Sequence, residues 1–564
     1  MIYKTWTAVG LVAVWSITAC EPAAVTNATQ IPATTPEVSS STLPVADCAH
    51  VLRLAVKPQH DTVLTQSDSL LFIKDSSVNM FYRKRNFKPL WDSVEKIDQA
   101  VNTLLHADTH GLVAVDYAIE RILQLRQVAM REEYQNPHTL AKLEIALTTG
   151  LLRYATHLLA GKLVPTQLHP LWNYPSRAFV HQHRIELLEK YVAADSVATV
   201  FQHIRRHPHY VFLQNQLAAY KKMAAAGVFQ PLQCDTTIRK GGLHPAIIRL
   251  RKRLFAEKID ADSSANPVLD DSLSKALQIW QYRHGLKQTG VLDTATRNAL
   301  NVPVEQRIAT IRANMERMRW LPDTLPADFI LVNIADFRLF LFRNGEVVWE
   351  TPVTVGTRVN RTPVFQTYIS HLELNPTWNV PHSIVTKEIA VEAAKRSDYI
   401  TRNRFQIIDK NGMLIEPSTI NWSEVRSGKK VYHFYQPPGA GNQLGKIKFY
   451  CVNPHAIYLH DTPSLSKFKL QERAFSHGCV RVWKPFELAG LLMGDTTRWN
   501  QAAFDQLLAP GITRSVILPR REPVHIHYFT AFPDRTGQLI LRRDIYGHDR
   551  QLLQLLDLPL QSMQ

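Results

Sequence analysis

The first half of the chain places apolar residues at helical spacing. Between about residue 48 and residue 240 they recur every three or four positions, which is the period of an amphipathic helix. The clearest series consists of Leu140, Leu143, Leu147, Leu151 and Leu158. We expect that helix to end near Gly161, because glycine commonly terminates helices. The pattern predicts a helical domain over residues 48–243.

A smaller helical unit is predicted for residues 244–303. Its two apolar stripes are made by Ile247, Leu250 and Leu254, and by Leu273, Leu277 and Trp280. The second helix is expected to begin near Asp271–Ser272 and to end at Gly285, and Asp293 is expected to cap a third helix. A linker helix is predicted to follow within residues 304–325.

From Asp328 onward the pattern changes to that of β-strands. Runs rich in aromatic and branched apolar residues flank Asn344-Gly345, a dipeptide typical of two-residue hairpin turns. We therefore expect a mainly β domain over residues 326–520, followed by a C-terminal extension over 521–564. Within the β domain, residues 386–445 contain one helical piece and a Gly/Pro-rich loop, and a segment of that length predicts a lid over a cleft. The predicted fold class is multidomain α+β.

The N-terminal residues have the composition of an export signal followed by a stalk. Lys4 precedes the apolar run Thr5–Ala19, which is shorter than the ~20 residues of a membrane-spanning helix. Ile17-Thr18-Ala19-Cys20 resembles the lipobox of bacterial lipoproteins, which implies that residues 1–19 are removed and that Cys20 is lipidated. Residues 20–47 are rich in Thr, Pro, Ser and Ala, so they are expected to form a flexible stalk. The predicted location is the periplasm, with a lipid anchor in a membrane leaflet that the sequence does not identify.

Composition adds one unusual feature, the charge. The 65 Lys and Arg residues against 49 Asp and Glu residues leave a net charge of +16. A composition of 45% hydrophobic and 20% charged residues excludes collagen-like, coiled-coil and wholly disordered classes. The positive charge favours an anionic polymer as partner. Because the predicted export signal argues against nucleic acid, we expect that polymer to belong to the cell envelope.

The cysteines and paired histidines form no pattern typical of a metal site. The chain lacks a Cys-x-x-Cys motif, and the histidine pairs His181/His183 and His207/His209 have no further ligands at useful spacing. No metal and no other cofactor is therefore expected. Cys48 and Cys234 are compatible with a disulfide in an exported protein, although sequence does not establish their pairing.

The candidate chemistry lies in residues 458–482. Acyl transfer by a cysteine requires a thiolate, an imidazole that takes its proton, and backbone N–H groups that bind the oxyanion. His460 at the end of a strand and Cys479 after a glycine turn supply the first two, and protonation of His460 would favour the Cys479 thiolate at neutral pH. Gly478 lets the backbone approach a substrate, and the N–H groups of Gly478 and Cys479 are the expected oxyanion donors.

The neighbours of this pair have more open interpretations. Arg481 is placed to bind a substrate carboxylate, whereas His477 either shapes the turn or hydrogen-bonds the substrate. The side chain of Asp461 should leave the strand on the face opposite His460, so we expect a main-chain carbonyl to orient the imidazole. The alternative for His460 is a histidine packed in the core.

These residues carry a resemblance to a known family. His460 followed by Ser476-His477-Gly478-Cys479 and Arg481 resembles the motif of YkuD-type L,D-transpeptidases. Similar segments surround Asn375, Trp378 and Tyr458, although Tyr435 stands where that family often has arginine before the lid glutamine. Residues 280–300 resemble the peptidoglycan-binding domain 1 family. Most of the chain is similar to the large periplasmic subfamily, with a scaffold domain, a peptidoglycan-binding unit and a lidded catalytic domain.

The resemblance implies a peptidoglycan L,D-transpeptidase without a cofactor. Cys479 would attack the third residue of a tetrapeptide stem, His460 would protonate the departing D-Ala, and another stem amine would open the thioester to give a 3→3 cross-link. The resemblance also implies that carbapenems acylate Cys479. The substrate contacts that it implies are Asn375, Trp378, Tyr458, Ser476, His477 and Arg481. Two alternatives stay open, namely a hydrolase of the same fold (an L,D-carboxypeptidase or amidase-like enzyme) and a non-catalytic murein-binding anchor.

Overall fold

The computed structural model describes residues 43–55, 76–174, 186, 189–190, 207–259, 262–322 and 325–559. The predicted signal, Cys20, most of the predicted stalk and the His181/His183 pair lie outside the described residues. Within these ranges, no helix combines the length and apolar character needed to cross a membrane.

The N-terminal domain consists of helices arranged around one long helix. The helices are α1 (Val45–Ala55), α2 (Ser76–Lys84), α3 (Val94–Leu105), α4 (Ile119–Arg131), α5 (Pro137–Ala160), α6 (Pro165–Leu168) and α9 (Pro208–Ala225). Helix α5 begins at Asn136, whose side chain accepts hydrogen bonds from the backbone N–H groups of His138 and Thr139, and it ends before Gly161. The five leucines that predicted it are all buried, which confirms the helix and its end.

A polar network is buried under α5. The Glu144 carboxylate accepts hydrogen bonds from the backbone N–H groups of Leu90 (2.5 Å) and Trp91 (3.1 Å) and from the Tyr82 hydroxyl (2.6 Å). Burial raises the pKa of Glu144 to about 7. These bonds connect α5 to α2 and to the segment between α2 and α3. They also compensate the cost of burying the carboxylate.

The three-helix unit contains α10 (Ala246–Ala256), α11 (Asp271–Arg283) and α12 (Thr294–Leu300). Its core contains the six residues of the two predicted stripes, each fully buried. Asp293 caps α12 by accepting a hydrogen bond from the Thr296 N–H at 2.8 Å, as predicted. The cap of α11 is Asp270, immediately before the predicted start. Helix α13 (Val304–Trp320) follows as the linker.

The β domain is built on a nine-stranded sheet. Its strands are β1 (Phe329–Asn333), β2 (Arg338–Arg343), β3 (Glu346–Gly356), β4 (Phe365–Leu374), β8 (Ile447–Cys451), β9 (Leu459–His460), β10 (Ala474–Ser476), β11 (Val480–Val482) and β12 (Arg514–His527). Their order is β10-β3-β11-β9-β8-β4-β12-β1-β2, and β2 also pairs with β3, so the sheet curls back on itself. Asn344 and Gly345 both have positive φ between β2 and β3, which confirms the predicted hairpin turn.

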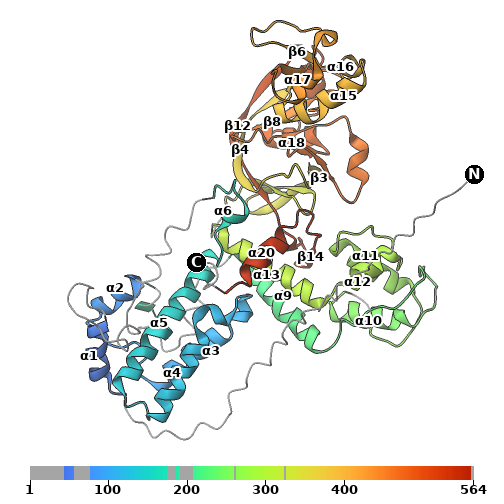
Figure 1. Ribbon diagram of the computed structural model, residues 1–564. Helices are drawn as coiled ribbons and strands as arrows, with labels where there is room; N and C mark the ends of the chain where they lie inside the picture. The colour runs from blue at the N-terminus through green and yellow to red at the C-terminus, as the bar shows by residue number, and fades with distance from the viewer. Residues whose placement is uncertain are drawn as a thin grey trace, which may run out of the picture. The chain divides into compact units, whose positions relative to one another are not determined.

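The predicted lid is a folded subdomain with its own core. Between β5 (Trp378–Asn379) and β8 it contains α14 (His382–Ile384), a π-helical turn (Val385–Ile389), α15 (Ala390–Lys395), α16 (Tyr399–Arg402), β6 (Gln406–Ile408), α17 (Trp422–Arg426) and β7 (His433–Gln436). Strands β5, β7 and β6 form a small sheet. Ile389, Ile407 and Phe434 are among the residues that pack between that sheet and the helices. Figure 1 shows these elements together beside β8 and α18 (Pro485–Met493).

The C-terminal residues continue both the sheet and its core. Strand β12 extends to His527, and Tyr546 packs into the core of the nine-stranded sheet. After α19 (Gln501–Leu508) and β12, the chain forms the hairpin β13 (Ala531–Pro533) and β14 (Leu539–Leu541), and then α20 (His548–Leu556). The residues beyond 520 therefore pack in two cores: Tyr546 lies in that of the sheet, whereas Ala531 and Leu541 of the hairpin pack with residues of α9 and α13.

The Cys48–Cys234 disulfide that the sequence left open is absent, since both residues are free thiols. Cys48 is buried in α1, where burial raises its pKa to about 12. Cys234 is packed in the core of the three-helix unit, and its thiol donates to the Thr236 carbonyl at 3.1 Å. Each thiol is packed within its own unit.

Candidate active site

A cavity of about 640 Å³ lies between the lid and the nine-stranded sheet. The sheet side contributes His460, Cys479 and Arg481, and the lid side contributes residues such as Trp378 and Glu388. This volume falls within the range of pockets that enclose small ligands. The predicted lid thus covers the residues that carry the predicted chemistry.

Strand pairing brings Cys479 and His460 together. Strands β9 and β11 run parallel, with Leu459 opposite Val480 and His460 opposite Arg481. The Val480 N–H donates to the Tyr458 carbonyl at 2.9 Å, which fixes this register. Cys479 comes immediately before β11, so its thiol and the His460 ring line the same cavity from neighbouring strands.

The His460 ring is oriented by a main-chain carbonyl, as the sequence predicted. Its Nδ1 lies 2.5 Å from the Asp461 carbonyl oxygen. A carbonyl only accepts, so Nδ1 carries the proton and Nε2 is left as the basic nitrogen. The Asp461 side chain instead accepts a hydrogen bond from the Lys446 N–H at 2.8 Å. The arrangement is therefore a Cys–His pair with a carbonyl as the third group.

Both reactive groups are neutral in the closed cavity. Burial, reinforced by the charges of Arg481 and Lys448, lowers the pKa of His460 to about 3. Burial also raises the pKa of the Cys479 thiol. Both shifts oppose the expected pair of a thiolate and a protonated imidazole, because a low-dielectric cavity disfavours both charges. The Cys479 thiol instead donates a hydrogen bond to the Ala456 carbonyl at 3.5 Å.

The turn before Cys479 is braced by hydrogen bonds and by a glycine. Gly478 has a φ of +119°, and a Cβ there would lie 3.0 Å from the Ile457 Cδ1 atom. The buried Ser476 hydroxyl donates to the Cys479 carbonyl at 2.5 Å and accepts from the Gly478 N–H at 3.1 Å. Ser476 therefore shapes the turn. Because the Gly478 N–H is already used, the Cys479 N–H is the expected oxyanion donor that stays available.

Two residues that sequence reasoning missed support this turn from behind. The buried Thr362 hydroxyl donates to the Gly478 carbonyl at 2.7 Å. The Tyr546 hydroxyl donates to the Gly356 carbonyl at 2.6 Å and accepts from the Thr362 N–H at 3.2 Å. The C-terminal extension thus supports the turn before Cys479 indirectly, through Thr362, and its bond to Gly356 joins residues 190 positions apart.

His477 points to the lid. Its Nε2 forms a short contact with the Glu388 carboxylate, which belongs to the π-helical turn of the lid. Both side chains are partly exposed at the cavity, with exposed fractions of 38% and 48%. Sequence reasoning missed Glu388, because the pairing joins residues 89 positions apart.

Arg481 is the unpaired cation of the cavity. Its Nε is buried without a hydrogen-bond partner, and within the described part of the chain no carboxylate pairs with it. Lys448, by contrast, binds Glu373 at 3.1 Å and lies over the Tyr458 ring at 4.3 Å. Burial lowers the pKa of Arg481, and the nearby Cys479 opposes that effect. An anionic group of a ligand would compensate this charge.

Trp378 and Tyr458 line the cavity, whereas Asn375 does not. The Asn375 side-chain amide donates to the Leu508 carbonyl at 2.9 Å. The backbone carbonyl of Asn375 accepts from the Thr513 hydroxyl at 2.7 Å. The structure therefore gives the substrate contact expected for Asn375 no support. Its φ of +46° places it in a turn, where it positions the start of the lid.

Comparisons with protein families match three regions of the chain. Residues 327–518 match the family described as "L,D-transpeptidase catalytic domain" (YkuD). Residues 244–300 match "Putative peptidoglycan binding domain", and residues 76–217 match "Scaffold domain".

Individual proteins are similar over parts of the chain. A protein of Haemophilus influenzae named "Putative L,D-transpeptidase" is 35% identical over 239 residues, which are 42% of this chain and 48% of that protein. The chain thus spans about half the length of that relative. The solved Ldtfm–avibactam carbamoyl enzyme is 11% identical, with 40% and 64% of the two chains covered and a TM-score of 0.18. An L,D-transpeptidase structure from Xylanimonas cellulosilytica is 14% identical, with 53% and 100% covered and a TM-score of 0.17. Scores this low carry no structural argument.

Proposed function

We propose that the chain cross-links peptidoglycan through a thioester on Cys479, because residues 327–518 match the family described as L,D-transpeptidase catalytic domain. The observation that carries this proposal is the placement of Cys479, His460 and the unpaired Arg481 in one lidded cavity. A nucleophile, a base and an anion-binding group are what acyl transfer between carboxylate-bearing peptides requires.

In the first step, Cys479 attacks the carbonyl of the third residue of a tetrapeptide stem. His460 Nε2 takes the thiol proton as attack proceeds, and the imidazolium then protonates the departing D-Ala amine. A neutral resting pair suits this order of events. The thiol gives up its proton as the sulfur attacks, and the negative charge then develops on the substrate oxygen. The Cys479 N–H is placed to bind that oxyanion.

In the second step, the side-chain amine of another stem opens the thioester. His460, neutral again, accepts the proton of the attacking amine, and a 3→3 cross-link forms. Arg481 is positioned to hold a stem carboxylate during either step. The folded lid supports transfer over hydrolysis, since a covered cavity limits the access of water.

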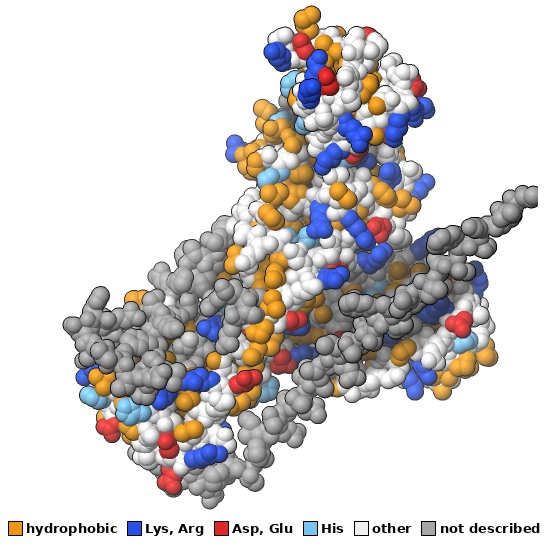
Figure 2. Space-filling model, viewed as in Figure 1, with side chains coloured by type: hydrophobic (Ala, Val, Ile, Leu, Met, Phe, Trp, Pro, Cys, Tyr) orange, Lys and Arg blue, Asp and Glu red, His pale blue; other side chains and the backbone are white. Residues whose placement is uncertain are grey.

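The proposed setting is the periplasm, with the lipid anchor at Cys20 holding the enzyme near its polymer. On the face shown in Figure 2, lysine and arginine side chains are spread over the lid and the β domain and do not gather into one stripe. Such a spread suits general attraction to a polymer that carries stem carboxylates, without the basic stripe of a nucleic-acid site. Carbapenems are expected to acylate Cys479 because they present an activated carbonyl to the same nucleophile.

The decisive experiment incubates the wild type and a Cys479→Ala variant with purified disaccharide-tetrapeptides and identifies the products by mass spectrometry. We expect 3→3 dimers from the wild type only, and similar binding of both proteins to isolated sacculi. Dimers formed by the variant would refute the assignment of the nucleophile. Tripeptide monomers without dimers from the wild type would indicate a hydrolase, and the absence of any product would indicate a murein-binding anchor.

A further inference from the structure

The charges of the active-site cavity lie on different walls. Among the described residues that line it, the lysine and the arginine belong to the sheet: Arg481 lies on β11, and Lys448 lies on β8 opposite His460. Glu388 of the lid is the only residue of that described lining with a carboxylate. A ligand in the cavity therefore meets cations on the sheet side and an anion on the lid side.

The lid core holds Glu388 at the cavity. Glu388 belongs to the π-helical turn Val385–Ile389, and the two end residues of that turn are each 2% exposed in the lid core. The Glu388 side chain is 48% exposed, so the turn that buries its neighbours leaves the carboxylate open. Single π-helical turns within α-helices are frequent at functional sites. The carboxylate is thus carried by a well-packed element and is available to a ligand.

Glu388 lacks a permanently charged partner. Its carboxylate contacts Nε2 of His477, a ring that carries a positive charge only when it is protonated. Within the described ranges of the chain, no lysine or arginine forms an ion pair with Glu388. Glu392, four residues further along, pairs by contrast with Lys395 at 2.9 Å. Glu388 can therefore bind a cation from a ligand without breaking an ion pair to lysine or arginine.

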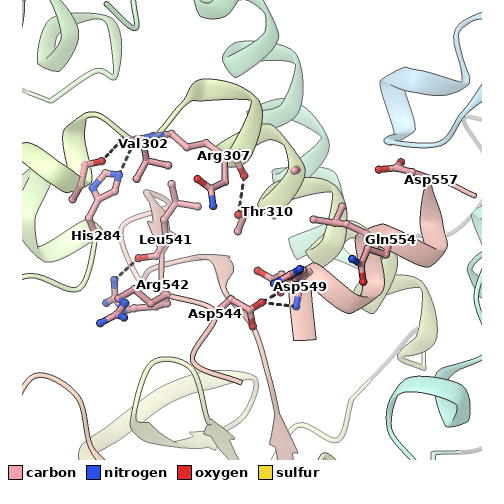
Figure 3. Close-up of a pocket in the computed structure, with 16 residues that line it drawn as sticks. His284, Val302, Arg307, Thr310, Leu541, Arg542, Asp544, Asp549, Gln554 and Asp557 are labelled. Atoms are coloured by element: carbon pink, nitrogen blue, oxygen red, sulfur yellow. Dashed lines mark hydrogen bonds between the residues drawn. The ribbon is translucent and has the colours of Figure 1, made fainter. Parts of the chain in front are cut away.

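The acids that line another cavity show how such groups are otherwise compensated. That cavity, of about 700 Å³, lies between the three-helix unit, α13 and the C-terminal segment (Figure 3). Its Asp544 accepts hydrogen bonds from the backbone N–H groups of Asp549 (2.9 Å) and Arg550 (3.2 Å). The Asp549 carboxylate pairs with Arg317 at 2.6 Å. Groups of the chain itself hold both carboxylates, whereas the polar contact of Glu388 is with a titratable ring.

The proposed reaction supplies a cation for the Glu388 carboxylate. In its second step an amine opens the thioester, and a side-chain amine, whose pKa is about 10.4 in lysine, is an ammonium at neutral pH. An ammonium that leaves water for a covered cavity needs an anionic partner, and the cations of the sheet side repel it. Its N–H groups donate to a carboxylate both before and after it loses a proton. Because His477 comes two residues before Cys479, an amine held at Glu388 lies beside the turn that carries the thioester.

We propose that Glu388 binds the amine of the acceptor stem and thereby makes a positively charged amine the preferred acceptor. This inference rests on the proposed function, because the amine attacks a thioester on Cys479. The two stems are then distinguished by charge: a stem carboxylate is directed to Arg481, and the acceptor ammonium is directed to Glu388. Glu388 is a specificity-determining residue of the second step.

The test measures how the thioester is divided between an added nucleophile and water. The full chain is incubated with unlabelled disaccharide-tetrapeptide and one of two nucleophiles. One is an isotope-labelled disaccharide-tripeptide, whose amine is charged, and the other is hydroxylamine, which is uncharged at neutral pH. Mass spectrometry gives the ratio of transfer product to unlabelled tripeptide. The rate of thioester formation cancels from this ratio.

The variants change one charge each. Glu388→Gln removes the charge but retains an oxygen that accepts a hydrogen bond from His477. Glu392→Gln is the matched control, because it makes the same change four residues away and outside the cavity lining.

We expect Glu388→Gln to lower the transfer ratio for the labelled acceptor about tenfold, the effect of one charge-assisted hydrogen bond. The ratio for hydroxylamine should change less than about twofold, because that nucleophile brings no charge to the carboxylate. Glu392→Gln should leave both ratios unchanged.

Two outcomes would overturn the inference. One is an unchanged ratio for the labelled acceptor in Glu388→Gln. The other is an equal loss with both nucleophiles, which would mean that the contact of Glu388 with His477 only keeps water out. Hydroxamate formed by the wild type shows that the thioester exists, so either outcome would then leave the proposed function standing. If the wild type gives no product with either nucleophile, the proposed function fails and the inference fails with it.

Discussion

A cluster of buried histidines predicts that the protein loses stability below neutral pH. His169 follows α6, His525 and His527 lie on β12, and His548 begins α20; all four are at least nine-tenths buried. The Tyr174 hydroxyl lies 2.8 Å from a ring nitrogen of His525 and of His527, and the His169 and His548 rings meet at 4.9 Å. The cluster thus joins the helical domain to the β domain.

The environment of the cluster strongly disfavours protonation. Burial lowers the pKa of His169 and of His548 to about 3 and that of His525 to about 4. The positive charge of Arg317 adds to this effect at His169 and His548. The Asp549 carboxylate pairs with Arg317 at 2.6 Å. It is therefore not a free partner for a positive charge on the histidine rings.

The magnitude follows from proton linkage. The unfolded chain binds a proton at each of these histidines below about pH 6.5, whereas the folded chain does not until pH 3 to 4. The stabilisation is therefore complete above pH 6.5 and is lost as the pH falls toward the folded values. At pH 5, His169, His525 and His548 should each have lowered the free energy of unfolding by about 2 kcal/mol, or by about 6 kcal/mol together. A loss of that size is comparable to the whole stability of many domains, about 5–15 kcal/mol.

The assay measures the free energy of unfolding in urea at several values between pH 7 and pH 5. His169→Gln should reduce its slope with pH by up to about 1.4 kcal/mol per pH unit. The matched control is His433→Gln, which alters an exposed histidine of the lid. Equal slopes for the wild type and His169→Gln would refute the linkage argument, whatever the absolute stability of the variant.

Three further predictions concern the lid, the imidazole and the linker helix. Glu388→Ala breaks the contact with His477, so more thioester should be hydrolysed; the ratio of tripeptide to dimer measures this, and an unchanged ratio would argue against a role of that contact in closure. Asp461→Asn should change the rate of Cys479 acylation by a carbapenem less than about tenfold, because the backbone carbonyl orients His460. Stopped-flow spectroscopy measures this rate. A loss above about a hundredfold would show that the Asp461 side chain takes a direct part. Arg319→Met removes the cation of a fully buried pair with Glu316 (2.5 Å) and should cost about 3–5 kcal/mol in urea unfolding; a cost below 1 kcal/mol would show that the pair does not stabilise α13.

Local patterns predicted the elements well. The leucine series of α5, the Asp293 cap and the Asn344-Gly345 turn were each predicted correctly, because neighbouring residues alone decide helix faces, caps and two-residue turns. His460 was correctly predicted at the end of a strand and Cys479 after a glycine turn. The expectation that a backbone carbonyl would orient the imidazole was also right, since alternation along a strand is a local property.

Other properties of the site came only from tertiary structure. The neutral resting state of Cys479 and His460 depends on how deeply the folded lid and sheet bury them, and the use of the Gly478 N–H by Ser476 depends on the geometry of one turn. Three further contacts join residues far apart in the chain. They are the bond of Tyr546 to Gly356, the contact of His477 with Glu388, and the bond that holds Asn375 to Leu508. The sequence by itself therefore determined which residues are the candidates for the reaction. The tertiary structure decided their charge, partners and accessibility, because desolvation and hydrogen bonding depend on every segment that packs around a group.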